Sequence, residues 1–100
     1  MFVQLDKPNH PALLEEHNFQ ALKVKALKGS SSHKIESMLG SLGRLDGEHA
    51  WLSVEALKRL GPDENAWREK FAAMVAYAEG AGWVSKDKAF VQAHIDLSES

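Results

Sequence analysis

Residues 53–82, SVEALKRLGPDENAWREKFAAMVAYAEGAG, carry the strongest local signals in the chain and decide its expected architecture. Ser53 can cap a helix, because its hydroxyl can accept a hydrogen bond from an amide in the first turn. Gly61 readily adopts the left-handed conformation that ends many helices, and Pro62 has no amide hydrogen with which to continue one. These residues predict a first helix over 53–60.

A second helix is predicted over 63–80. Asp63 and Glu64 place negative charge at its start, where the helix dipole favours it, and Glu64 is expected to pair with Arg68 four residues later. The large apolar residues recur at helical spacing and form one stripe that can be buried. The stripe consists of Trp67, Phe71, Met74, Val75 and Ala78. Two glycines at the end stop the helix.

Three other segments alternate between apolar and polar residues, which is typical of strands buried on one face. These segments are 20–27, 48–52 and 89–97. Asp46-Gly47, a favoured hairpin turn, comes just before the second of them. Helical spacing fits parts of the same regions, so strand and helix both stay open for 20–42 and 89–97.

Together these elements predict an α+β fold in a single domain over residues 1–100, long enough for one modest core. A small antiparallel sheet is expected, covered on one face by the two helices. Three tryptophans are expected to supply much of the interior: Trp51, Trp67 and Trp83. A wholly helical fold is the alternative if the ambiguous segments are helical.

Composition excludes several classes of function. The chain has no cysteine, which excludes disulfides, thiolate catalysis and cysteine-based metal sites. The formal net charge of −2 offers no overall attraction to nucleic acid or to an anionic membrane. No apolar run approaches the ~20 residues of a transmembrane helix, and the chain does not open with the pattern of a secretory signal. We therefore expect a cytoplasmic protein without membrane contact.

No catalytic or cofactor motif stands out. The sequence contains no glycine-rich phosphate loop, no zinc-protease helix, no calcium loop and no nucleophile elbow. Strong metal sites usually place two histidines two or four residues apart, and no pair here has that spacing. The histidines are His10, His17, His33, His49 and His94. We expect neither metal nor cofactor, and a non-enzymatic role is favoured over catalysis.

One group of polar residues is a candidate ligand site. On a strand His94 and Asp96 share a face, and a carboxylate so placed can orient an imidazole. If segments 48–52 and 89–97 are neighbours, His49 and His94 converge on one surface. The full candidate set is Glu48, His49, Tyr77, His94 and Asp96. The competing interpretation, which we favour, is the solvated outer face of a sheet.

Positive charge is concentrated in the middle of the chain. Residues 21–45 carry five basic side chains and one acidic one, whereas 46–100 carry six basic and ten acidic ones. The five basic residues are a candidate docking surface: Lys23, Lys25, Lys28, Lys34 and Arg44. A solvated lysine-rich face is the simpler interpretation. No aromatic residue interleaves with these lysines along the sequence, which disfavours single-stranded nucleic acid as a partner.

We rank three functions. The first is a non-enzymatic interaction or accessory protein that docks on a protein partner or on itself, because the charge is split between the two segments. The second is a small-molecule binder, or a modest enzyme, with a pocket between sheet and helices that uses His49 and His94. Nucleic-acid binding through the basic segment ranks last.

Overall fold

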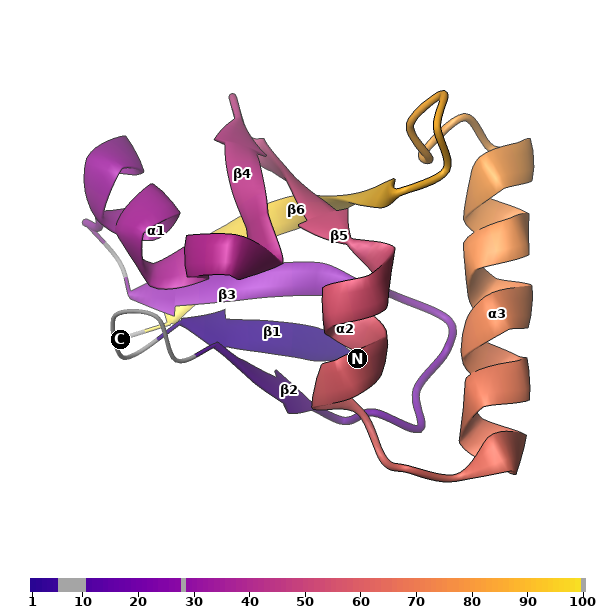
Figure 1. Cartoon of the computed structure of the whole chain (residues 1–100). Helices are drawn as coiled ribbons and strands as arrows, with labels where there is room; N and C mark the ends of the chain where they lie inside the picture. Colours follow the sequence, from indigo (N-terminus) through magenta and orange to yellow (C-terminus); the bar gives the residue numbers. More distant parts are fainter. Residues whose placement is uncertain (6–10, 28, 100) are drawn as a thin grey trace.

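The computed structural model describes residues 1–5, 11–27 and 29–99. It contains an α+β fold, which confirms the expected class and excludes the wholly helical alternative. In chain order the elements are β1 (Phe2–Leu5), β2 (Ala12–Leu14), β3 (Lys23–Leu27), α1 (Ser32–Leu39), the short 3-10 helix η1 (Gly40–Leu42), β4 (Gly43–Asp46), β5 (His49–Ser53), α2 (Val54–Leu60), α3 (Asn65–Gly80) and β6 (Phe90–Glu99) (Figure 1).

The predicted elements are confirmed, but the predicted sheet is wrong in size and direction. β3, β5 and β6 correspond to the three predicted strands, and α2 and α3 to the two predicted helices. The sheet has six strands in the order β2-β1-β3-β6-β5-β4. β3 runs parallel to both its neighbours, β1 and β6, while the other pairs are antiparallel. Parallel strands are joined by long connections, so no local pattern in the sequence predicts a parallel pairing.

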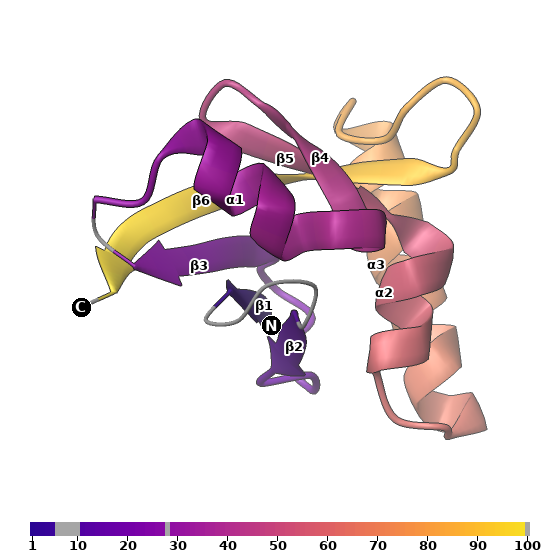
Figure 2. The same ribbon diagram turned by 60° about the vertical axis from the view of Figure 1, so that its left-hand side comes forward.

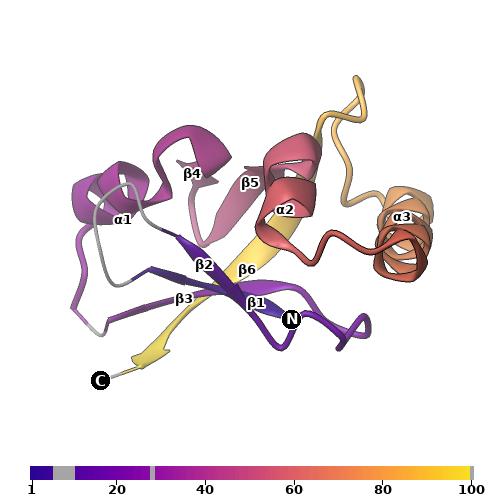
Figure 3. The ribbon, with the colours of Figure 1, turned by 60° about the horizontal axis from the view of Figure 1, so that its bottom comes forward.

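Helices cover one face of this sheet. α1, η1 and α2 lie on the same side of the strands, and α3 stands beside α2 at the end of the sheet (Figures 1 and 3). Along β1, β3, β5 and most of β6 alternate residues are buried beneath them, because successive side chains on a strand point to opposite faces. This covered face consists of Val3, Leu5, Val24, Ala26, Ala50, Leu52, Val91, Ala93 and Ile95. Ile35, Met38 and Leu39 of α1 and Leu57 of α2 pack against it, and Met1, Leu42, Trp67, Phe71 and Ala78 belong to the same core.

Trp67 anchors α3 to the rest of the fold. Its ring is buried and stacks on Phe71 with 5.1 Å between ring centroids, and its indole nitrogen donates to the carbonyl of Glu16 over 2.8 Å. Gly61 has a φ of −83°, so its expected left-handed conformation is wrong. The glycine is needed for space instead, because a Cβ there would overlap the Trp67 ring.

The other two tryptophans correct a second expectation. Trp51 is only half-buried and Trp83 is 49% exposed, so the interior depends on Trp67 alone among the three. The alternation explains Trp51: it follows the buried Ala50 on β5 and therefore points to the opposite face.

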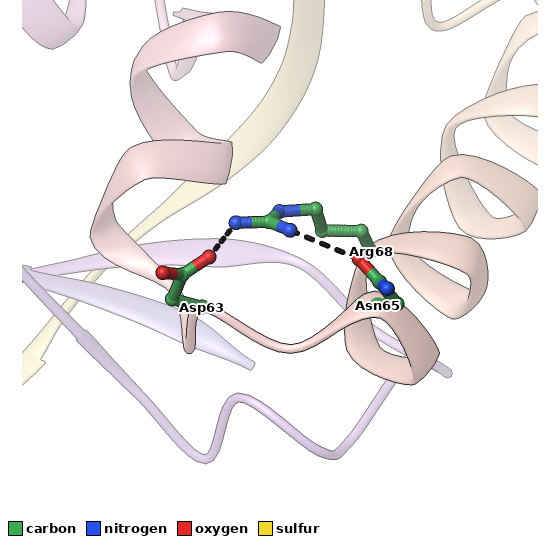
Figure 4. A network of polar contacts seen from close by, with 3 residues as sticks. All are labelled: Asp63, Asn65 and Arg68. Atoms are coloured by element: carbon green, nitrogen blue, oxygen red, sulfur yellow. Dashed lines mark hydrogen bonds and ion pairs between the residues drawn. The ribbon is translucent and has the colours of Figure 1, made fainter.

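α2 starts as the sequence predicts, but the ion pair predicted at the start of α3 is absent. Ser53 caps α2 as predicted, accepting a hydrogen bond from the amide of Ala56 over 3.2 Å. The predicted Glu64–Arg68 pair does not form. Arg68 instead contacts the carboxylate of Asp63 and the side-chain oxygen of Asn65, the latter over 3.2 Å (Figure 4). Glu64 is the extended N-cap residue of α3: its carbonyl accepts from the Arg68 amide over 3.0 Å, but its side chain does not leave a helical backbone as such a pair requires.

The hairpin between β4 and β5 sets the register of the sheet's second half. Asp46 pairs with His49, so the two loop residues are Gly47 and Glu48, one position later than the expected Asp46-Gly47. Gly47 has a φ of 61°, the positive value that this kind of tight turn requires of its first loop residue.

In the part of the chain that the structure describes, no helix combines the length and apolar character needed to cross a membrane.

The chain terminus is packed into the same fold. The Met1 side chain is buried, and its amino group donates to the carbonyls of Asn18 and Ala21 over 2.6 and 2.9 Å. Burial of this group lowers the pKa of the N-terminal amine from its usual value of 8.0, because a charged ammonium loses hydration there.

Candidate functional site

No described helix covers the sheet face opposite α1 and α2, and we call it the open face (Figures 2 and 3). Its side chains are the alternates of the buried ones, and all of them are half-buried or exposed. On the strands they include Phe2, Gln4, Ala12, Leu14, Lys23, Lys25, Arg44, Asp46, His49, Trp51, Phe90, Gln92, His94 and Asp96. Trp83 extends this face, because the segment before β6 places it opposite Gln92.

One row of side chains crosses the open face from edge to edge. Each member is the register partner of the next, so the row takes one residue from every strand. In order these are Leu14, Phe2, Lys23, His94, His49 and Asp46. Neighbouring strands lie about 4.8 Å apart, so the row is about 24 Å long. Apolar, cationic, imidazole and carboxylate groups thus share one continuous row.

His49 and His94 form the centre of this row. Their ring centroids are 5.5 Å apart and the rings meet edge to face at 70°. The amide of Ile95 donates to the carbonyl of Glu48 over 3.0 Å, so the adjacent histidines occupy the closer type of antiparallel pair, without mutual backbone hydrogen bonds. The two strands are neighbours, as the ligand-site hypothesis required. Ligand binding by the pair stays a prediction.

A shallow groove starts at this histidine pair. Its first part has a volume of about 230 Å³ and is lined by Leu22, His49, Trp83, Gln92 and His94. A second part of about 100 Å³ shares Leu22, Trp83 and Gln92 and adds the side chains of Phe19, Met74 and Tyr77. We call the two parts together the His–Trp groove. It is polar at the imidazole end and apolar beside α3.

Trp83 reaches the groove because residues 83–84 pair with β6 on its β3 side, opposite β5. The amide of Gln92 donates to the carbonyl of Trp83 over 2.7 Å, and Val84 pairs with Val91. Asp87 stabilises the following turn by accepting hydrogen bonds from the Ser85 hydroxyl at 2.5 Å and the Ala89 amide at 3.1 Å. These bonds, the one from Ser85 first, lower the pKa of Asp87.

The five predicted ligand-site residues do not form one cluster. His49 and His94 meet, and Asp96 shares their face but lies 3.9 Å from the Lys23 ammonium in a loose ion pair. Tyr77 lines the far part of the His–Trp groove and is 74% exposed. Glu48 occupies the hairpin turn and lines a second cavity of about 290 Å³, which it shares with His94 and with Ser32 of α1.

One cavity lined by His94 is also lined by Ser32 and Ile35 of α1, so it lies at a contact between sheet and helix, as the sequence interpretation placed the pocket. His49 instead lines the His–Trp groove on the open face, because the alternation that buries Ala50 on the covered face turns His49 the other way. Use of either cavity by a ligand stays a prediction. Within the described residues, no group of three or more His, Asp or Glu side chains could hold a metal ion.

The predicted basic docking surface is split. Lys23, Lys25 and Arg44 lie on the open face, whereas Lys34 is exposed on α1, a helix of the covered side. Lys28 lies outside the described residues. The surface therefore retains three of its cations.

Sequence reasoning missed the aromatic residues of the open face. Lys25 places its ammonium 4.0 Å from the centroid of the Phe2 ring, and the Arg44 guanidinium lies 5.5 Å from that of Phe90. Trp51 donates from its indole nitrogen to the Asp46 carboxylate over 2.9 Å. A signal for Trp51 existed, because it stands two residues after His49 and so shares its face. None existed for Phe2, whose partners come from distant parts of the chain.

Comparison with known proteins adds no relative. A scan against models of protein families gives no match, and searches of curated proteins and of solved structures give none either. The role of the open face must therefore be inferred from its own residues.

Proposed function

We propose that this chain is a non-catalytic binding module that takes its partner on the open face. The observation that carries the proposal is the open face itself, where a row across all six strands joins the rings of Phe2, His94 and His49 to the cation Lys23 without a covering helix. Aromatic residues and arginine are the types enriched where proteins contact partners. This surface carries Phe2, Trp51, Trp83 and Arg44.

The arrangement of the polar groups also favours binding over catalysis. The imidazoles of His49 and His94 contact each other on an accessible surface, whereas catalytic groups work best in a cavity that excludes water. Both carboxylates of the face already have partners, since Asp46 accepts from Trp51 and Asp96 lies near Lys23. The cytoplasmic location expected from the sequence stays a prediction.

A pair of matched variants tests this proposal. The open-face variant is Trp83→Ser with His94→Ser, and its control is Leu60→Ser with His33→Ser. The control changes the same kinds of exposed residue on α2 and α1. Each tagged chain is used for affinity capture from a lysate of its source organism. Retained protein, nucleic acid and small molecules are all identified.

We expect at least one component to be retained by the unaltered chain and the control variant but lost from the open-face variant. Identical sets of retained components from both variants would refute a binding role for the open face.

A small-molecule binder is the second candidate, and the His–Trp groove favours it. Its two parts join a polar imidazole end to an apolar end, which suits a small molecule with one polar group on an apolar body. An NMR fragment screen tests this function. Fragments that shift the signals of Gln92 and Met74 together would support it, and a screen without such fragments would refute it.

A further inference from the structure

We propose that the open face binds single-stranded nucleic acid. This inference rests on the proposed function and names the class of partner. Along the sequence the lysines of the middle segment have no aromatic neighbours, which is why nucleic acid ranked last. In the folded sheet, other strands place aromatic residues next to these lysines, so the open face has the components that the sequence lacks locally.

Rings and cations alternate in space. Lys25 lies on the ring of Phe2, and Lys23 is the register partner of both Phe2 and His94. On the other half of the sheet Arg44 pairs with Trp51. Proteins that bind single strands combine cations for the phosphates with flat rings on which bases stack. Both components are present on one uncovered surface.

The charge of the open face differs from that of the whole chain. Among the described residues, three cations and two carboxylates give the face a net charge of +1, whereas the whole chain carries −2. Asp46 is held by the Trp51 indole. Asp96 faces Lys23 at 3.9 Å in a loose, partly exposed ion pair. Screening limits each charge to about 8 Å, so the local excess matters more than the total.

The length of the row sets the expected size of the site. About 24 Å from edge to edge accommodates a short single strand of about four nucleotides, the lower end of the range for one small sheet domain. A duplex is not expected to bind in this way, because its bases are stacked on one another and cannot stack on Trp83.

Other partners would use only part of this surface. An acidic peptide would engage Lys23, Lys25 and Arg44 but leave the rings without a role. An apolar protein surface would cover the rings and bury the cations at a cost in hydration. A polyanion with flat faces uses both kinds of side chain throughout its length.

Tryptophan fluorescence provides the test on the full chain. The probe is an oligodeoxythymidylate of about eight nucleotides, long enough to cover the row. Trp51 and Trp83 lie on the open face and should be quenched, whereas the buried Trp67 should not. Binding is measured at several salt concentrations between 50 and 200 mM, the range over which phosphate contacts lose most affinity.

The decisive comparison uses Lys23→Gln with Lys25→Gln against the control Lys34→Gln with Lys70→Gln. Both pairs remove two positive charges, but the control residues lie on α1 and α3. The first pair should raise Kd at least about tenfold and reduce the salt slope by about 1.4, the value for two single-strand phosphate contacts. The control should change the net charge without either effect. Unchanged Tm values would show that both variants fold.

Three outcomes would overturn the inference. They are equal losses of affinity in the two pairs, equal competition by a duplex, and equal competition by thymidine monophosphate at the same nucleotide concentration. If the oligomer fails to bind but affinity capture still yields a partner that depends on the open face, this inference is wrong and the binding module stands. If capture finds no such partner either, the proposed function fails as well.

Discussion

The two faces of the sheet are built from the same strands but carry different chemistry. The covered face holds aliphatic side chains such as Val3, Val24 and Leu52, which are fully buried. The open face holds rings and charges drawn from positions one residue away. A strand period of two therefore lets one short segment serve both stability and recognition. Adjacent substitutions along a strand should separate these two roles.

The largest effect is expected on the covered face. Leu52→Ala removes a fully buried side chain and should lower the free energy of unfolding by about 3 kcal/mol, since it leaves a cavity. Gln92→Ala, at a neighbouring position on the open face, should change it by less than about 0.5 kcal/mol. Urea denaturation followed by circular dichroism measures both. Similar losses for the two variants would contradict the division of roles.

The next effect concerns the contact that attaches α3 to the core. Gly61→Ala forces a methyl group into the Trp67 ring and should destabilise the fold by about 2 kcal/mol. Gly80→Ala is the matched control, because a Cβ there meets open space at the end of α3 and should stabilise slightly, by about 0.5 kcal/mol. The unfolding temperatures of both variants measure these two changes in stability. A stable Gly61→Ala variant would show that the ring moves freely.

A smaller effect is expected in the turn that leads from Trp83 into β6. Lys88 has a φ of 61°, a left-handed value that costs a side chain about 1 kcal/mol. Lys88→Gly should therefore stabilise the chain by about 0.5 kcal/mol, even though it removes the exposed pair with Glu79. Lys86→Gly, in the same turn but without positive φ, should destabilise instead. Chemical denaturation that ranks the two variants in the opposite order would disprove this account.

The smallest effect is a pH dependence from the N-terminal amine beside the core. Its pKa is lowered in the fold, so between that value and 8.0 the unfolded chain binds more protons than the folded one. The free energy of unfolding should therefore rise with pH through this window and level off above it. Solvent screens the partly exposed amine, which keeps the gain small. A chain with an acetylated terminus should show no rise, and an equal rise there would assign it to another group.

Local patterns were enough to predict the elements that form the centre of the fold. The alternation in residues 89–97 and the stripe that contains Trp67 and Phe71 each show which side of a single segment is buried. The strand and the helix that they predict are both confirmed. β1 and β2 were missed because they are short and depend on pairing with other strands. The same limit explains the candidate site. The row that joins Phe2 to His94 exists only after distant strands have met, so no spacing in the sequence contains it.

The order of the strands divides the sheet into two halves that are separate in sequence. β2, β1 and β3 come from the first part of the chain and β6, β5 and β4 from the last, and the halves meet where Lys23 pairs with His94. A strand of nucleic acid lying on the row would contact both sides of this junction. Such a ligand would bind only when the two halves are joined. By mass action its binding would therefore raise the unfolding temperature of the entire chain.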